Sequence, residues 1–171
     1  RMSIDEKYLP VKSVINEISS AKDSLIDCDE YLEENSGDQR KRLIGEVYKA
    51  YSQVLSDSDA MDFDDMISYT VKLLQENEDV LEYYGSKFKY IMVDEYQDTN
   101  HAQYVLVNLL SKAHKNLCVV GDDDQSIYRF RGATIENILN FEDEYRGAKT
   151  IRLEQNYRST SNILEAANAV I

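Results

Sequence analysis

The sequence predicts an α/β protein in which a helical part precedes a parallel sheet. Through the first third of the chain, apolar residues recur every three or four positions, as they do along one face of a helix. From Lys89 onward, short unbroken apolar runs alternate with helical stretches, which is typical of strands buried on both faces of a parallel sheet. Only one proline and six glycines interrupt the 171 residues, so we expect long helices.

The helical part is expected to occupy residues 1–60. Apolar spacing predicts amphipathic helices over residues 11–27 and 39–56. The stretch between them, residues 29–38, is polar and acidic and is interpreted as a connector. The helical part therefore contains two predicted helices joined by a loop.

Residues 61–171 are expected to form the α/β part. Its first helix begins at Phe63 with Asp62 as the cap, and a short second helix ends at Gly85. The predicted strands are residues 90–93, 117–120 and, more weakly, 150–153. The predicted helices between and after these strands are residues 100–113, residues 134–143 and a helix that begins at Ser161. Each strand is thus followed by a helix, as parallel pairing requires.

Composition excludes several classes of protein. Nineteen basic and 32 acidic residues give a formal charge of −13, which argues against attraction of nucleic acid to the whole surface but not against a local groove. No apolar run approaches the ~20 residues of a membrane span, and the first residues do not resemble a signal peptide. Two distant cysteines, Cys28 and Cys118, indicate neither a disulfide framework nor a zinc site. We interpret Cys118 as a small buried residue and expect a cytoplasmic protein.

Two adjacent acids, Asp94 and Glu95, follow the first predicted strand. Ligands of open α/β sheets bind at the carboxyl ends of the strands. One carboxylate there can hold Mg²⁺, directly or through water, while the other orients an attacking water. The alternative is a pair of solvated acids, and the acid pair taken alone favours that alternative.

The other two strands also lead into polar segments. The second runs through Gly121, which permits a tight turn or a close backbone approach, into a loop with groups that suit phosphates and bases. Those groups are Gln125, Tyr128, Arg129, Phe130 and Arg131. The third strand is followed by Tyr157 and Arg158, and a positioned arginine can stabilise a transferring phosphoryl group. The alternatives are rings packed beneath the loop and a surface arginine that caps a helix.

These residues belong to a series of motifs. DFDDM, VDEYQDTN, VVGDDDQSIYRFRGA and LEQNYRST follow one another with the order and spacing seen in UvrD/Rep/PcrA-type superfamily I DNA helicases, which residues 62–171 resemble closely. Residues 11–60 are similar, more loosely, to the helical insertion of that family's first RecA-like domain. The resemblance implies a helical insertion subdomain over residues 1–60. It also implies a partial RecA-like P-loop NTPase domain over residues 61–171, ending at the junction to a second such domain.

The resemblance implies ATP and Mg²⁺ as cofactors. Asp94 and Glu95 would form the metal site, with Asp94 holding Mg²⁺ on the phosphates and Glu95 also acting as the general base for the attacking water. Gln97 and Asp98 would link the ATP site to the neighbouring loop. The remaining residues expected to contact ATP are Gln125 and Arg158, at the γ-phosphate, and Tyr157, which would stack on adenine.

The resemblance also implies a DNA groove, lined by Tyr128, Phe130 and Arg131. Phe130 would be the base-stacking ring, at a position where family members commonly carry Trp. Because Gln125 and Phe130 lie five residues apart, one short segment would contact both a phosphate and a base. The implied function is ATP-driven translocation on single-stranded DNA, in the 3′ to 5′ direction, with unwinding at single/double-strand junctions. Repair or replication proteins would be its protein partners, and no membrane would be involved.

One expected motif is missing. The chain contains no GxxxxGK[ST], the phosphate cradle of P-loop enzymes. Arg1 precedes Met2, and the last predicted helix is incomplete, so we expect an internal fragment that folds but does not hydrolyse ATP alone. Two other functions stay open. A metal-dependent nuclease could use the acids of DFDDM together with Asp94 and Glu95, and a helicase-like scaffold would have no catalysis.

Overall fold

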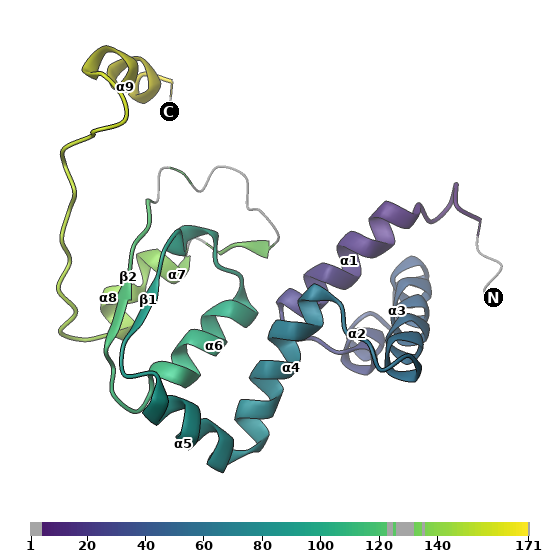
Figure 1. The fold of residues 1–171 in the computed structure, drawn as a ribbon. Coiled ribbons are helices and arrows are strands. Elements are labelled where there is room, and N and C mark those ends of the chain that lie inside the picture. Colours follow the sequence, from purple (N-terminus) through teal and green to yellow (C-terminus); the bar gives the residue numbers. More distant parts are fainter. Residues whose placement is uncertain (1–4, 123–124, 126–131, 135, 171) are drawn as a thin grey trace. The chain divides into compact units, whose positions relative to one another are not determined.

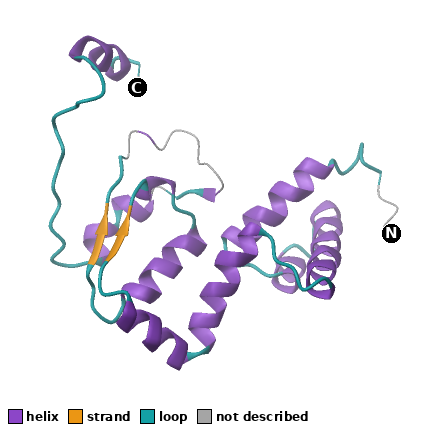
Figure 2. Cartoon of the chain, viewed as in Figure 1, coloured by secondary structure: helices purple, strands orange, loops and turns teal. Residues whose placement is uncertain are grey.

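The computed structural model describes residues 5–122, 125, 132–134 and 136–170. Figures 1 and 2 show the arrangement of the elements and the predominance of helix. The chain forms two compact units, residues 1–139 and residues 140–171. The first unit contains α1 (Val11–Asp23), α2 (Cys28–Glu34), α3 (Gln39–Asp57), α4 (Phe63–Glu76), α5 (Glu78–Lys87), β1 (Ile91–Val93), the 3₁₀ turn η1 (Tyr96–Asp98), α6 (His101–Ser111), β2 (Leu117–Val119) and α7 (Glu136–Leu139). The second contains α8 (Phe141–Glu144) and α9 (Ser161–Asn168).

The main apolar core of the first unit joins its first three helices. α1 supplies Val14, Ile18 and Ala21, and residues of α2 and α3 pack with them, whereas the apolar residues Val11 and Ile15 of α1 are exposed. The buried members are Leu9, Val14, Ile18, Ala21, Tyr31, Ile44 and Tyr48. The predicted helices over residues 11–27 and 39–56 are thereby confirmed, although α1 ends at Asp23 because Leu25 adopts a left-handed conformation with φ 61°.

The predicted connector at residues 29–38 is wrong, because most of it lies in α2. The side chain of Asp27 accepts hydrogen bonds from the backbone amides of Asp29 and Glu30, and the Glu30 carboxylate accepts one from the amide of Asp27. The acidic residues of this stretch are therefore compatible with a helix. They form its capping box, and negative charge is favourable in the first turn of a helix.

Among the described residues of the first unit, α4 to α7 follow these three helices. α4 begins where predicted, with Asp62 as its cap, and it packs against both α1 and α6. α5 continues through Lys87, so the prediction that Gly85 ends this helix is wrong. Gly85 is buried inside the helix, where the carbonyl of Leu110 at the end of α6 approaches it. A glycine therefore marks a helix contact here and not a C-terminal cap.

The sheet consists of β1 and β2, which pair in parallel with Ile91 opposite Leu117 and Val93 opposite Val119. Two of the predicted strands are confirmed, and the mostly helical chain with its small parallel sheet fits the α/β class. The prediction that both faces are buried is wrong. Met92 is 80% exposed, and its partner across the ladder, Cys118, is also exposed, because neither side chain is covered by the described residues.

The second unit contains no strand within residues 140–170. The predicted strand at residues 150–153 is therefore wrong. A strand needs a hydrogen-bonded neighbour, and within the described residues this segment has no ladder partner, while Leu153 is 85% exposed. The predicted helix over residues 134–143 is divided at Asn140 into α7 and α8, and the helix expected from Ser161 is confirmed as α9.

Candidate functional site

Asp94 and Glu95 directly follow β1, as predicted, and both side chains are exposed. Glu95 has φ 50° and ψ 43°, a left-handed conformation that a non-glycine residue adopts at a cost of roughly 1–2 kcal/mol. The amide of Glu95 donates to Asp94 Oδ1 at 2.9 Å, and the next amide, that of Tyr96, donates to the carbonyl of Val120 at 2.9 Å. A strained residue held by its surroundings is typical of functional sites.

Gln97 connects the ends of the two strands. Its Nε2 donates to Glu95 Oε2 at 2.8 Å, and its Oε1 accepts from the backbone amide of Asp122 at 3.1 Å. The residue is only 1% exposed, so both ends of its amide group are fixed inside the protein. Gln97 thus positions the Glu95 carboxylate after β1 relative to the segment that follows β2. Asp98, the other residue predicted to link these segments, is exposed.

Gly121 lies where the segment after β2 approaches Gln97 closely. A Cβ atom there would lie 2.7 Å from Gln97 Oε1, 2.8 Å from Ile138 Cδ1 and 3.2 Å from the backbone nitrogen of Gln97. These distances are shorter than van der Waals contact, so only glycine fits. The predicted close backbone approach at Gly121 is confirmed.

Asp122 extends the hydrogen-bonded chain to Gln125. Gln125 Nε2 donates to Asp122 Oδ2 at 2.6 Å, and the Gln125 amide donates to the Asp122 carbonyl at 3.2 Å. Hydrogen bonds therefore link four residues one after another: Glu95, Gln97, Asp122 and Gln125. Reasoning from the sequence missed the part played by Asp122, although its position directly after Gly121 at a strand end was a usable signal.

The acidic segment, residues 94–100, is hydrogen-bonded to α1 at its far end. Asn100 caps α6 by accepting a hydrogen bond from the amide of Gln103, and its Nδ2 donates to Asp23 Oδ1 at 2.6 Å. Asp23 and Asn100 are both buried. The contact joins the last residue of α1 to the residue that follows VDEYQDT. The Asn-x-x-Gln spacing of the cap is visible in the sequence, whereas the contact with Asp23 is not.

The residue before Asp23 makes a second buried connection. Lys22 Nζ lies 2.6 Å from Asp62 Oδ2 and 2.7 Å from Asp65 Oδ1, and Tyr51 also donates to Asp62. Burial favours the neutral form of Lys22, but hydrogen bonds and charge from the two carboxylates outweigh it and raise the pKa of Lys22. For Asp62, burial is likewise outweighed, by hydrogen bonds from Lys22, the Asp65 amide and Tyr51, and its pKa is lowered.

These contacts bear on the acids of DFDDM. Asp62 and Asp65 bind Lys22, and Asp64 accepts a hydrogen bond from Ser19 at 2.7 Å. Among the residues that the structure describes, no three histidines, cysteines or acids are grouped so that they could hold a metal ion. The acids of DFDDM therefore serve as anchors for α1, which does not favour the nuclease interpretation.

The remaining predicted site residues fall into two groups. Tyr157 and Arg158 lie in the second unit, where Tyr157 is 93% exposed and the Arg158 amide donates to Asn156 Oδ1 at 2.8 Å. The three residues of the predicted DNA groove, Tyr128, Phe130 and Arg131, lie outside the described residues.

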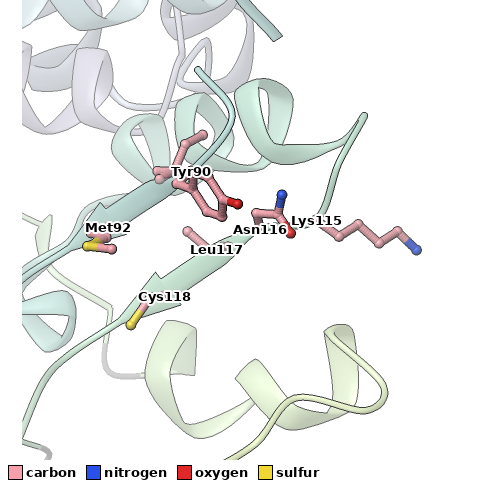
Figure 3. A pocket seen from close by; sticks show the side chains of 7 residues that line it. Tyr90, Met92, Lys115, Asn116, Leu117 and Cys118 are labelled. Carbon is pink, nitrogen blue, oxygen red and sulfur yellow. The ribbon is translucent and has the colours of Figure 1, made fainter. Parts of the chain in front are cut away.

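A shallow pocket lies at the beginnings of the strands, away from the acidic segment. Figure 3 shows it beside β1 and β2, with lining side chains that include Tyr90, Met92, Asn116 and Cys118. None of the predicted site residues lines this pocket. Within the described part of the chain, no helix is long and apolar enough to cross a membrane.

Comparison with known proteins gives one consistent result. Residues 1–146 match the UvrD/REP helicase N-terminal domain. The chain is 53% identical to the ATP-dependent DNA helicase PcrA of Staphylococcus epidermidis, 52% to that of Staphylococcus aureus and 50% to that of Bacillus subtilis, each over 169 residues. Each match covers 99% of this chain and 23% of the relative, so the chain spans about a quarter of the length of these curated relatives.

Proposed function

Because this chain belongs to the UvrD/REP helicase N-terminal domain family, we propose that it is the part of an ATP-dependent DNA helicase that couples ATP hydrolysis to movement on single-stranded DNA. Separation of the strands at a single/double-strand junction follows from this movement. Translocation from 3′ to 5′, a cytoplasmic location and partners in repair or replication are included in the proposal because the family resemblance implies them.

The observation that carries this proposal is the hydrogen-bonded chain from Glu95 through Gln97 and Asp122 to Gln125. It joins the polar ends of two parallel strands, which is where ligands bind in open α/β sheets. The same arrangement supports a RecA-like assignment for residues 61–171, with residues 1–60 as a helical insertion. These two domain boundaries stay a prediction.

Asp94 and Glu95 are suited to a Mg²⁺–nucleotide complex. Mg²⁺ bound to phosphates needs only one or two protein carboxylates, and both side chains here are exposed oxygen donors. When bound, Mg²⁺ neutralises charge on the phosphates. Glu95 would accept the proton of the attacking water, and Gln97, which donates to Oε2, leaves Oε1 for that task.

Gln125 would sense the γ-phosphate at the other end of the hydrogen-bonded chain. A contact with phosphate would compete for the Nε2 group that now binds Asp122 Oδ2. A change in that bond would act next to the segment that carries Tyr128, Phe130 and Arg131, the proposed DNA-binding residues. Arg158 would stabilise charge on the γ-phosphate, and Tyr157 would stack on adenine.

Glu95→Gln tests the proposed catalysis in the full-length protein that carries this chain. The substitution keeps the shape of the side chain and removes the proton acceptor. We expect ATP binding, measured with a fluorescent analogue, to be nearly unchanged and turnover to be lost. The matched control is Glu46→Gln, an exposed position on α3, which should turn over normally. Normal turnover in Glu95→Gln would exclude Glu95 as the base.

Phe130→Ala tests the proposed DNA contact in the same protein. Loss of one base-stacking ring, worth about 1–3 kcal/mol, should weaken single-strand binding by roughly 5- to 150-fold and uncouple ATP turnover from unwinding. Tyr90→Ala removes another exposed ring, before β1, and should leave DNA affinity unchanged. Equal affinity and unwinding in Phe130→Ala and the unsubstituted protein would make Phe130 a packing residue.

The isolated 171-residue chain is expected to fold without hydrolysing ATP, because it has no GxxxxGK[ST] cradle. Phosphate release by the purified chain, with and without single-stranded DNA, measures this directly. DNA-stimulated turnover by this chain alone would contradict the expectation.

A further inference from the structure

The segment that begins at Asp122 is attached to the acidic segment a second time, at Thr99. The amide of Thr134 donates to the carbonyl of Thr99 at 3.1 Å. Asn137, at the start of α7, donates from Nδ2 to the same carbonyl and to Thr99 Oγ1, both at 3.2 Å. Thr99 is buried and Asn137 is half-buried, so these bonds are partly shielded from water. Thr134 and Asn137 are therefore both hydrogen-bonded to Thr99, a residue of VDEYQDTN.

Thr99 directly follows the η1 turn and is its C-terminal cap. Its Oγ1 donates to the carbonyl of Tyr96 at 2.7 Å, while the same oxygen accepts from Asn137. Gln97, in the same turn, holds the amide of Asp122. One short turn thus holds both ends of the segment between Asp122 and Thr134, so a displacement of the turn moves both ends together.

We propose that Asn137 is a positioning residue. It holds the start of α7 against Thr99, next to η1, so that nucleotide and DNA binding affect each other. The inference rests on the proposed function and extends it to a residue outside the predicted site. Because Gln97 binds Asp122 and Thr99 binds Thr134, a displacement of this turn would reach both residues. Coupling between two ligand sites typically changes an affinity by about 5- to 150-fold.

The test uses Asn137→Asp in the full-length protein. The substitution is nearly isosteric, but it replaces the donor with an oxygen that faces the carbonyl of Thr99. Asn116→Asp is the matched control, because Asn116 Nδ2 also joins distant segments, through the carbonyl of Lys89, but at the opposite ends of the strands. Thermal unfolding, ATPase activity without DNA, and ATPase activity with oligothymidylate are measured for each variant.

We expect Asn137→Asp to keep the DNA-independent rate and to lose about tenfold in stimulation by DNA. Asn116→Asp should keep full stimulation. Equal stimulation in the two variants would overturn the inference. Absence of DNA-stimulated ATPase activity in the unsubstituted protein would instead refute the proposed function, so the two failures are distinguishable.

A second measurement covers the case in which Asn137→Asp does not fold. In the unsubstituted protein with Mg²⁺ and a non-hydrolysable ATP analogue, addition of oligothymidylate should change hydrogen exchange at the amide of Thr134. The amide of Ile91, which donates to the carbonyl of Asn116, is the internal reference and should not change. Unchanged exchange at Thr134 would overturn the inference.

Discussion

The side chain of Asn100 donates a 2.6 Å hydrogen bond to the carboxylate of Asp23, which lies 77 positions earlier in the chain. Both residues are buried, and each ends or begins a helix. The bond fixes the end of the acidic segment against α1, and several consequences can be measured.

Exchanging the side chains of Asp23 and Asn100 should restore the stability that a substitution of Asn100 alone removes. Asn100→Asp keeps an oxygen that can cap α6 but places two carboxylates face to face, so we expect a loss of about 1–3 kcal/mol in the free energy of unfolding. The double variant Asn100→Asp, Asp23→Asn should recover most of that loss, measured by urea unfolding. Asn77→Asp is the control, because its amide group donates to the carbonyl of Leu73 and not to a carboxylate. A double variant no more stable than Asn100→Asp would contradict the contact.

Lys22→Met should destabilise the fold strongly. Lys22 is 3% exposed, and its removal leaves the carboxylates of Asp62 and Asp65 without their cation. Breaking a buried pair from one side costs about 3–5 kcal/mol, a loss that thermal or urea unfolding would detect. Lys49→Met breaks an exposed pair with Asp29 and serves as the control. If both substitutions had the same small effect, the Lys22 cluster would not stabilise the protein.

Acid should remove the contribution of Asp62. Its pKa in the folded protein lies below the ordinary value of 3.8 because hydrogen bonds from Lys22, Asp65 and Tyr51 outweigh the effect of burial. Stability gained in this way is present above the unfolded pKa and lost as pH falls through the folded one. The difference in unfolding free energy between the unsubstituted chain and Asp62→Asn should be constant above about pH 5 and shrink below about pH 4. If this difference grew on acidification, the pKa of Asp62 could not be lowered in the folded protein.

Gly121→Ala should disrupt the junction between the strand ends. The added methyl group would meet the backbone nitrogen of Gln97 as well as two side-chain atoms, and backbone cannot move aside cheaply. We expect a loss of about 1–3 kcal/mol, as for other overpacked sites. Gly37→Ala is the control, because nothing lies within 4 Å of its added methyl group. Circular dichroism during urea unfolding would compare the two, and equal stability would show that the junction tolerates a side chain.

Local patterns in the sequence were sufficient for most of the helices and for both strands. The helices around Val14 and Ile44 follow from apolar spacing, and β1 and β2 from unbroken apolar runs. α2 was missed because acidic composition was given more weight than the capping box of Asp27 and Glu30. Residues 150–153 show the opposite error, because an apolar run predicts a strand only if a neighbour pairs with it.

The candidate site was predictable only in part. Strand ends placed Asp94, Glu95 and Gly121 correctly in the fold, since their positions depend on neighbours in the chain. The contacts of Asp23 with Asn100, and of Asn137 with Thr99, join residues far apart in sequence. No periodicity reveals such pairs, because they are set by how complete helices pack.

The two last residues of α1 limit how this protein can be dissected. Lys22 and Asp23 reach the starts of α4 and α6, respectively, so a recombinant piece beginning near residue 60 would carry Asp62, Asp65 and Asn100 without their partners. Such a truncation would yield an insoluble or unstable product even if the sheet and its helices were intact. Supplying the missing helices in trans, as a separately expressed polypeptide, should restore solubility.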